Sequence, residues 1–577
     1  MAEGPKRRLR LLITLLVAYV FFTVVQLVKV QIVEHEFYLR WALDQQVRSI
    51  RMDQPPRGVI RDRDGHLLAG NDLRYAVDAA PASVQDREGA AGDLAAVLHK
   101  PASHLLDQLS SRDEHGNYRQ WIRIEQPVSQ EVRDQVVDLG ISGVTVKPLW
   151  KRTYPEDDMA SHALGFATPM TGFYGVEGFY NEILQPEPVV WKGPLDPGSA
   201  PIPWQPITGE FPRRGVDLEL TLDRTVQGLV EAELARALET YQAEAGTIIV
   251  MEPETFGILG MASLPSYDPE DYARLADMNP ALFEDPAVSQ QYEPGSVFKI
   301  VTVAAALDAR IVTPETTYQD EGWIEVGGHP IRNSRDHRGI QSVTDILVKS
   351  LNVGAAWLSS TMGPDIFYRY VQDFGFSEPT NVDLAGEVAG QVPLPEDVER
   401  WSPSNLGTNA FGQGLAVTPL QMVTAVATVA NDGNRLRPHI VNRRFASDGA
   451  ESVFHPVLEE RVIAPETART LTEILVQVVE EGATNAQVEG YRVAGKTGTA
   501  QVPIPGGYDA EKTIASFVGF GPVPDPALVI LVRLDHPQTS EWGSQTAAPT
   551  FQRLATQLFT VLGIPPRGDA VLAEAGS

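Results

Sequence analysis

Residues 293–307 read E-P-G-S-V-F-K-I-V-T-V-A-A-A-L and predict a buried helix that begins at a Pro-Gly turn. The turn places Ser296 at or just inside the first helical turn. Lys299 follows three residues later, so both side chains project from one face of the helix, a single turn apart. Lys299 is also the only charge in a helix that is apolar nearly all round.

This pair of residues suits acyl transfer. A lysine in apolar surroundings has a lowered pKa, and only the neutral amine can take a proton from a serine hydroxyl. The helix N-terminus offers positive potential and free N–H groups to the negative charge that develops when Ser296 attacks a carbonyl. The alternative is a helix-capping serine followed by a lysine whose ammonium reaches the surface. The motif alone does not separate the two interpretations.

A second motif, S-L-N, lies at residues 350–352 and enters another predicted helix. The Ser350 hydroxyl is placed to relay a proton to a leaving amine, and the Asn352 amide to hold a substrate carbonyl. The alternative for this motif is an ordinary helix cap.

A third motif, K-T-G-T, lies at residues 496–499, just before a predicted pair of strands near the C-terminus. On an edge strand, Lys496 and Thr497 can bind a carboxylate, and Gly498 leaves room for a substrate backbone to approach. The alternative is the ordinary end of a strand.

Together and in this order, the three motifs resemble the S-x-x-K, S-x-N and K-T-G set of penicillin-recognising serine enzymes. The chain is similar, over nearly all of its length, to the class B penicillin-binding proteins. R-G-V-I-R-D-R at 57–63, R-T-Y-P at 152–155 with His162 and Gly165, and G-V-E at 175–177 resemble the N-terminal motifs of that family. Further matching segments are 220–223, 265–269, 412–414, 418–421 and 515–519. The middle motif is S-L-N rather than S-D-N, a common variant in this family that should leave transfer intact.

The resemblance implies a peptidoglycan D,D-transpeptidase. Ser296 would attack the D-Ala-D-Ala amide of a stem peptide, with unprotonated Lys299 as the base. Backbone N–H groups of Ser296 and Thr499 would form the oxyanion hole. An amine of a neighbouring stem peptide would then resolve the acyl-enzyme. The implied site comprises catalytic Ser296, Lys299, Ser350 and Asn352, and substrate-binding Lys496, Thr497, Gly498 and Thr499.

The resemblance also implies that β-lactams inhibit the protein covalently, that it needs no metal or organic cofactor, and that it works with a glycan-polymerising membrane protein. A D,D-carboxypeptidase or β-lactamase, in which water resolves the acyl-enzyme, is the nearest alternative. The large N-terminal module and the membrane anchor disfavour it. A penicillin sensor or silent scaffold is the alternative from another class, and a sensor would need several spans and a cytoplasmic output domain.

Residues 11–28 form an uncharged apolar run, preceded by four cations at positions 6, 7, 8 and 10. Eighteen helical residues span about 27 Å, close to the thickness of a bilayer core. The positive-inside rule keeps residues 1–10 in the cytoplasm and exports the rest. A cleaved signal peptide is the alternative, but the run is too long for a signal core and no A-x-A-like site follows. We expect a single-pass protein of the cytoplasmic membrane with its catalytic domain outside.

Composition supports a multidomain globular protein. The chain has 577 residues, beyond the about 250–300 at which one core usually splits. Its net charge of −28 disfavours nucleic-acid binding, and the absence of cysteine excludes disulfides, thiolate zinc sites and cysteine nucleophiles.

The predicted organisation starts with a tail at 1–10, a transmembrane helix at 11–29 and a polar helix at 34–51 that ends before two prolines. A mixed pedestal, or dimerisation-like, domain covers 45–185. A Pro-rich linker covers 186–214, a transpeptidase domain 215–565 and a terminal tail 566–577.

Two strand pairs bracket the large domain. Residues 246–253 and 257–264 flank a short turn, and 516–523 and 528–535 form a second pair near the C-terminus. Helices are expected between them, at 297–307 and 419–431. We therefore predict an α+β fold in which both ends of the domain meet in one antiparallel sheet.

Overall fold

The computed structural model describes residues 4–34, 47–51, 55–169, 171–186, 190–194, 213–504 and 506–566. The chain divides into two compact units, Met1–Pro56 with Pro186–Arg214, and Arg57–Gln185 with Gly215–Ser577. Most of the predicted linker and all but one residue of the predicted C-terminal tail lie outside the described residues.

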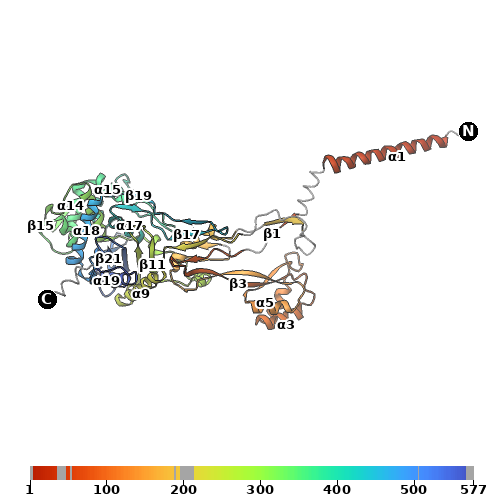
Figure 1. Ribbon diagram of the computed structural model, residues 1–577, viewed down its shortest axis with the longest axis horizontal. Helices are drawn as coiled ribbons and strands as arrows, with labels where there is room; N and C mark the ends of the chain where they lie inside the picture. Colours follow the sequence, from red (N-terminus) through yellow and green to blue (C-terminus); the bar gives the residue numbers. More distant parts are fainter. Residues whose placement is uncertain are drawn as a thin grey trace. The chain divides into compact units, whose positions relative to one another are not determined.

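The first unit contains the helix α1 (Gly4–Val28), which passes into a π-helical turn, η1 (Lys29–Val33) (Figure 1). Within it, Leu11–Val28 has a mean hydropathy of 2.5 and no buried residue. Among the described residues this is the one helix long and apolar enough to cross a bilayer, as a single-pass membrane protein requires.

The same unit contains a small two-stranded sheet. Strand β1 (Val47–Arg51) pairs antiparallel with β8 (Val190–Pro194). The prediction of a polar helix extending to Arg51 is therefore wrong for its last five residues. The hydrogen bonds of β1 go to a segment far along the chain, and local helix propensity does not reveal such a partner.

The second unit is built around a five-stranded antiparallel sheet in the order β11-β10-β22-β21-β20. The pairing of β10 with β22 joins the two ends of the domain, which confirms the predicted α+β fold. The strands are β10 (Ala245–Met251), β11 (Ile258–Leu264), β20 (Ala494–Ile504), β21 (Gly507–Gly521) and β22 (Leu528–Asp535).

Both faces of this sheet are covered, which explains why its strands are apolar at successive positions. In β10, Ile248 and Val250 join a core with the helices α9 (Arg224–Tyr241) and α19 (Ala547–Val561). Ile249, which points to the other face, joins the larger core. The helices of that core include α12 (Lys299–Asp308), α14 (Asn352–Met362), α15 (Pro364–Asp373), α17 (Pro419–Ala430) and α18 (Pro465–Gln477).

The predicted helices at 297–307 and 419–431 are confirmed. The first begins as a 3₁₀ turn, η4 (Gly295–Phe298), and continues as α12. The second, α17, starts with a capping box in which Thr418 and Gln421 satisfy each other's backbone N–H groups.

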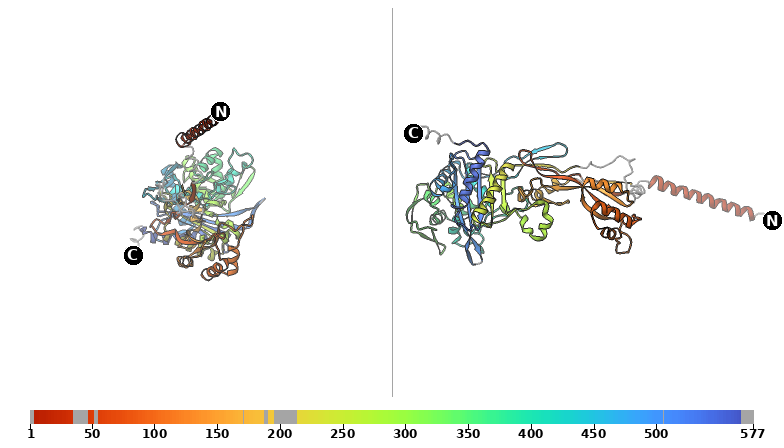
Figure 2. Two further views of the ribbon diagram at one scale, coloured as in Figure 1. Left: turned by 90° about the vertical axis from the view of Figure 1, so that its right-hand side faces the viewer. Right: turned by 90° about the horizontal axis from the view of Figure 1, so that it is seen from below.

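A second, seven-stranded sheet joins the N-terminal module to the large domain, in the order β18-β17-β9-β2-β3-β4, with β5 on the other edge of β3. The long strand β3 (Leu67–Ala79) continues into a lobe formed by α3 (Arg87–Leu98), α4 (Ala102–Leu109) and α5 (Gln130–Asp138) (Figures 1 and 2). The remaining strands of this sheet are β2 (Ile60–Arg61), β4 (Ile122–Val128), β5 (Val144–Thr153), β9 (Asp217–Leu220), β17 (Val441–Phe445) and β18 (Glu451–Val453).

Short elements complete the described chain. They are α6 (Ser161–Leu164), β6 (Phe166–Ala167), β7 (Gly172–Phe173), α7 (Gly175–Phe179), α8 (Asn181–Leu184), η2 (Pro269–Asp271), α10 (Tyr272–Met278), η3 (Pro280–Phe283), α11 (Pro286–Ser289), β12 (Thr317–Asp320), β13 (Trp323–Val326), β14 (His329–Arg332), β15 (Gly339–Ser342), α13 (Val343–Val348), α16 (Asn405–Thr408), η5 (Asn409–Phe411), β16 (Asn434–Leu436), β19 (Leu458–Arg461), η6 (Val478–Gly482) and η7 (Thr484–Ala486).

Candidate active site

Ser296 lies in the 3₁₀ turn η4, at the start of α12 and against strand β20. Two glycines allow this close approach. Gly295 has φ +57°, and a Cβ there would lie 3.0 Å from the Thr499 carbonyl oxygen. Gly412 has φ +78°, and a Cβ there would overlap the Gly295 carbonyl oxygen, while the Gly295 N–H donates to the Gly412 carbonyl oxygen at 3.1 Å. The backbone on both sides of the serine is thereby fixed.

The Lys299 side chain is completely buried and ends among oxygen atoms of the first two motifs. Its Nζ lies 3.1 Å from Ser296 Oγ, 2.7 Å from the Ser350 carbonyl oxygen and 2.7 Å from Asn352 Oδ1. Ser350 Oγ is 3.3 Å away. A surface lysine is therefore excluded.

The electrostatics of this position favour the neutral amine. Burial lowers the pKa of Lys299 well below its usual value, and the nearby charge of Lys496 lowers it further. A neutral amine has two N–H donors and one lone pair. The two oxygens at 2.7 Å, on Ser350 and Asn352, can only accept, so they take both donors. The lone pair is then left for the Ser296 hydroxyl.

Ser350 connects the first motif to the third. Its Oγ lies 3.1 Å from Lys496 Nζ as well as 3.3 Å from Lys299 Nζ, and its φ of +57° directs the hydroxyl between the two amines. Burial lowers the pKa of Lys496 to about 7. The hydroxyl thus bridges two lysines that both lose their charge easily.

The third motif lies on β20, which stands last in the strand order of the described residues, beside β21, and so forms an edge of the sheet. Lys496 Nζ also lies 3.3 Å from the Thr497 carbonyl oxygen. A side chain at Gly498 would collide with Ser516 Oγ and lie 2.8 Å from Val297 Cγ2. Close packing against the turn that carries the nucleophile is therefore a second reason for a glycine here, and space for a substrate backbone stays a prediction.

The structure thus brings five of the eight predicted site residues into direct contact: Ser296, Lys299, Ser350, Asn352 and Lys496. The other three, 497–499, follow on the same edge strand. Neither serine caps its helix, because Pro294 and Leu351 hold those positions. The capping alternatives are wrong.

Two supporting residues escaped sequence reasoning. The Gly543 N–H donates to Thr499 Oγ1 at 3.0 Å, and a Cβ at Gly543 would overlap the Gly498 carbonyl oxygen, so the loop after β22 packs directly on K-T-G-T. Asn333 Oδ1 accepts from the Val353 N–H at 3.0 Å, at the start of α14. Both contacts join distant segments, and no local pattern marks either residue.

The family comparisons agree with this geometry. Residues 246–556 match the penicillin binding protein transpeptidase domain, and residues 52–188 match the penicillin-binding protein dimerisation domain.

Individual proteins resemble the chain along most of its length. Stage V sporulation protein D of Bacillus subtilis is 34% identical over 98% of this chain and 87% of its own length. The peptidoglycan D,D-transpeptidase FtsI of Escherichia coli is 29% identical over 90% of this chain and 86% of its own length. The crystal structure of penicillin binding protein 3 from Mycobacterium tuberculosis, complexed with aztreonam, has a TM-score of 0.68 at 26% identity and covers 89% of this chain and 98% of that one. The chain therefore belongs to the class B penicillin-binding proteins, which are serine acyltransferases that act as peptidoglycan D,D-transpeptidases.

Proposed function

We propose that Ser296 is the nucleophile and Lys299 the general base of a peptidoglycan D,D-transpeptidase. The observation that carries this assignment is the set of contacts around Lys299 Nζ. Two oxygens that can only accept occupy its donors at 2.7 Å, and Ser296 Oγ lies 3.1 Å away. Burial, which lowers the pKa of Lys299, supports the neutral form that a base requires.

In the first half-reaction, Ser296 Oγ bonds to the carbonyl carbon of the penultimate D-Ala while its proton passes to Lys299 Nζ. Backbone N–H groups of Ser296 and Thr499 stabilise the oxyanion. The C–N bond to the terminal D-Ala then breaks, and the leaving nitrogen takes the proton through Ser350 Oγ. Support for this relay comes from the position of that hydroxyl, 3.3 Å from Lys299 Nζ.

In the second half-reaction, an amine of a neighbouring stem peptide attacks the ester carbonyl. Its proton leaves along the same route, and the bond to Ser296 Oγ breaks to regenerate the hydroxyl. Lys496, Thr497 and Thr499 bind the terminal carboxylate of the donor on the edge of β20, and Asn352 holds its amide carbonyl. β-Lactams acylate the same serine, and the acylated Ser296 can no longer attack a donor stem peptide.

The test is covalent labelling with a fluorescent penicillin, followed by peptide mass spectrometry. We expect Ser296→Ala to abolish the label and leave the thermal unfolding transition in place. Ser360→Ala, on α14, is the control for serine replacement and should label like the wild type. A Ser296→Ala protein that still labels at an unchanged rate would assign the nucleophile elsewhere.

We also propose that α1 anchors the protein in the cytoplasmic membrane, with the N-terminus in the cytoplasm and both folded domains outside. Support comes from the uncharged run Leu11–Val28 and the cations that precede it. Deletion of residues 1–33 should give a soluble protein that acylates with penicillin at the wild-type rate. Protease added outside intact spheroplasts should digest the catalytic domain of the full chain, and protection of that domain would reverse the orientation.

Finally, we propose that residues 45–185 form a pedestal domain, 186–214 a linker and 215–565 the transpeptidase domain, and that the pedestal docks a glycan-polymerising membrane protein. The dimerisation-domain match at 52–188 supports the extent of the pedestal domain.

The proposed partner follows from the reaction. Cross-linking needs a source of glycan strands, and residues 45–185 carry class B motifs instead of a polymerase. A purified polymerase from the same membrane should co-elute with the full chain in detergent. Co-elution that survives replacement of the lobe at 80–143 by a short linker would place the docking surface elsewhere.

A further inference from the structure

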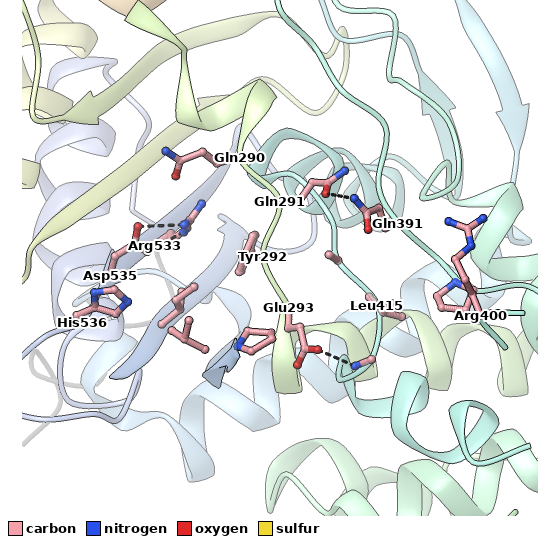
Figure 3. Close-up of a pocket in the computed structure, with 16 residues that line it drawn as sticks. Gln290, Gln291, Tyr292, Glu293, Gln391, Arg400, Leu415, Arg533, Asp535 and His536 are labelled. Carbon is pink, nitrogen blue, oxygen red and sulfur yellow. Dashed lines mark hydrogen bonds and ion pairs between the residues drawn. The ribbon is translucent and has the colours of Figure 1, made fainter. Parts of the chain in front are cut away.

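A cavity of about 630 Å³ lies beside the segment that leads to the nucleophile (Figure 3). One wall is the segment 290–293, which ends three residues before Ser296. The sheet lines the cavity through Val502, Ile514 and Arg533, and residues 414–416 line it as well.

Three polar side chains of these walls are buried and each has one atom without a hydrogen-bond partner in the described part of the chain. They are Tyr292 Oη, Glu293 Oε2 and Arg533 Nη1. These three residues are only 4%, 7% and 4% exposed. Burying such an atom without a partner costs stability, so native proteins rarely leave several in one place.

The rest of each side chain is firmly held. Arg533 donates to Asp535 through Nε and Nη2 at 2.7 and 3.0 Å, and its guanidinium lies 4.8 Å from the centre of the Tyr292 ring (Figure 3). Glu293 Oε1 accepts from the Gly414 N–H at 2.9 Å and from the Tyr508 hydroxyl at 3.3 Å. The three atoms without a hydrogen-bond partner therefore belong to side chains that are already held in place, as in a site that a ligand completes.

The direction of the bound donor follows from the proposed function. Its terminal carboxylate lies at Lys496 and Thr497, and its scissile carbonyl lies at Ser296, which borders Thr499. The path from the terminal carboxylate to the scissile carbonyl therefore runs along β20 toward the C-terminal end of that strand. The part of the stem peptide that precedes the two D-alanines therefore continues toward Val502, where the cavity begins.

We propose that this cavity binds the side chain of the stem residue that precedes the two D-alanines, and that it selects a side chain ending in both an ammonium and a carboxylate. The Arg533 guanidinium, which lies over the Tyr292 ring, and the Tyr292 hydroxyl donate to the carboxylate. Glu293 accepts from the ammonium. Arg533 is already neutralised by Asp535, so an overall neutral zwitterionic end fits this wall better than an anion alone. The inference rests on the proposed transpeptidase mechanism.

The test compares three donors of the form N-acetyl-X-D-alanyl-thioglycolate, whose thiol release reports acylation and whose leaving group keeps the terminal carboxylate. X is norleucine, lysine or 2,6-diaminopimelic acid, so the side chain ends in nothing polar, in an ammonium, or in an ammonium with a carboxylate. We expect the wild type to prefer the third donor, measured as kcat/KM. Tyr292→Phe should reduce the ratio of the third donor to the first about three- to tenfold, the value of one hydrogen bond.

Tyr292→Phe removes only an unpartnered hydroxyl, so a purely structural tyrosine would tolerate it. The matched control is Tyr491→Phe, which loses a hydrogen bond to the Ile564 carbonyl oxygen away from the cavity and should keep the wild-type ratio. A wild type that treats all three donors alike, or a Tyr292→Phe protein that slows all three equally, overturns the inference. Penicillin acylation of the wild type is measured in parallel, and its failure would instead overturn the proposed mechanism.

Discussion

At the scale of single residues, the site depends on two buried lysines that share one serine hydroxyl. The sequence motifs predicted which residues meet, because S-x-x-K places two side chains on one helical face. They did not predict why the pKa of Lys299 is low, or how its lone pair is left for Ser296. The low pKa depends on burial and on the charge of Lys496, which approaches from an edge strand. The free lone pair depends on the Ser350 carbonyl, in the turn before α14, and on the Asn352 amide, at the start of that helix. Such contacts arise only from tertiary packing.

The first prediction separates the roles of the two lysines. Lys299→Arg keeps the positive charge but cannot release its proton, so it should slow penicillin acylation about 10²–10⁴-fold, as loss of a general base does. Lys496→Arg should be milder, because a permanent cation suits a carboxylate partner. Both rates are measured with one penicillin at one pH. Acylation of Lys299→Arg within a few-fold of the wild type would contradict its role as the base.

The second prediction concerns pH. Acylation needs neutral Lys299, whose pKa lies well below its usual value, and cationic Lys496, whose pKa burial lowers to about 7. Because Lys496 loses its proton as the pH rises through this value, kcat/KM for an anionic penicillin should fall above about pH 7. Lys496→Arg keeps its charge and should show no such fall between pH 7 and 9. A parallel decline in both proteins would show that another group titrates.

At the scale of elements, apolar runs and turn signals predicted the two strand pairs of the central sheet, and the structure confirms them. The start of β21 was predicted at Ser516, but the strand begins at Gly507. Its first half contains polar residues, and only its pairing with β20 makes it a strand. The same reason explains β1, whose partner lies more than a hundred residues away. Partners distant in sequence supply the missing information.

The third prediction concerns the turn that holds Ser296. Gly412→Ala places a Cβ on the Gly295 carbonyl oxygen at a left-handed backbone position, so it should displace η4 and slow penicillin acylation at least tenfold. Gly328→Ala is the matched control, because Gly328 also has a positive φ, of +81°, but open space around it. The control should lower thermal stability slightly and leave the acylation rate unchanged. Equal acylation rates for the two variants would show that the position of η4 does not depend on the Gly412 turn.

At the scale of the folded unit that begins at Arg57, a buried ion network ties the N-terminal module together. Glu177 accepts from Arg57 Nε at 2.7 Å and from Arg152 Nε at 2.6 Å, and all three side chains are less than a tenth exposed. Arg57 also donates to Asn181, and Arg152 donates to the Gly58 carbonyl oxygen at 2.7 Å. The three residues belong to the three N-terminal motifs, so the motifs that identify the family are those that build this network.

The fourth prediction follows from that network. Burial opposes ionisation of Glu177, but the two arginines outweigh it and hold its pKa below the usual value. Glu177→Gln leaves two guanidiniums buried without a counter-charge, which should lower the free energy of unfolding by about 3–5 kcal/mol. The wild-type contribution is present above the unfolded pKa of a glutamate and is lost as the pH falls through the lower folded value. Denaturant unfolding of wild type and variant from pH 7 down to pH 3 measures both effects.

The control for this experiment is Glu156→Gln, which breaks a partly exposed pair at 2.7 Å between the same module and Arg224 at the start of α9. Solvent and salt screen that pair, so its loss should cost only a small part of what Glu177→Gln costs. No hydrogen bond or ion pair among the described residues joins Ser296 to the network, so the folded Glu177→Gln protein should still be acylated by penicillin. A variant that unfolds like the control would mean that the network adds little, because well-packed buried pairs can break even against their desolvation. A stable variant that no longer acylates would instead mean that the network communicates with the active site.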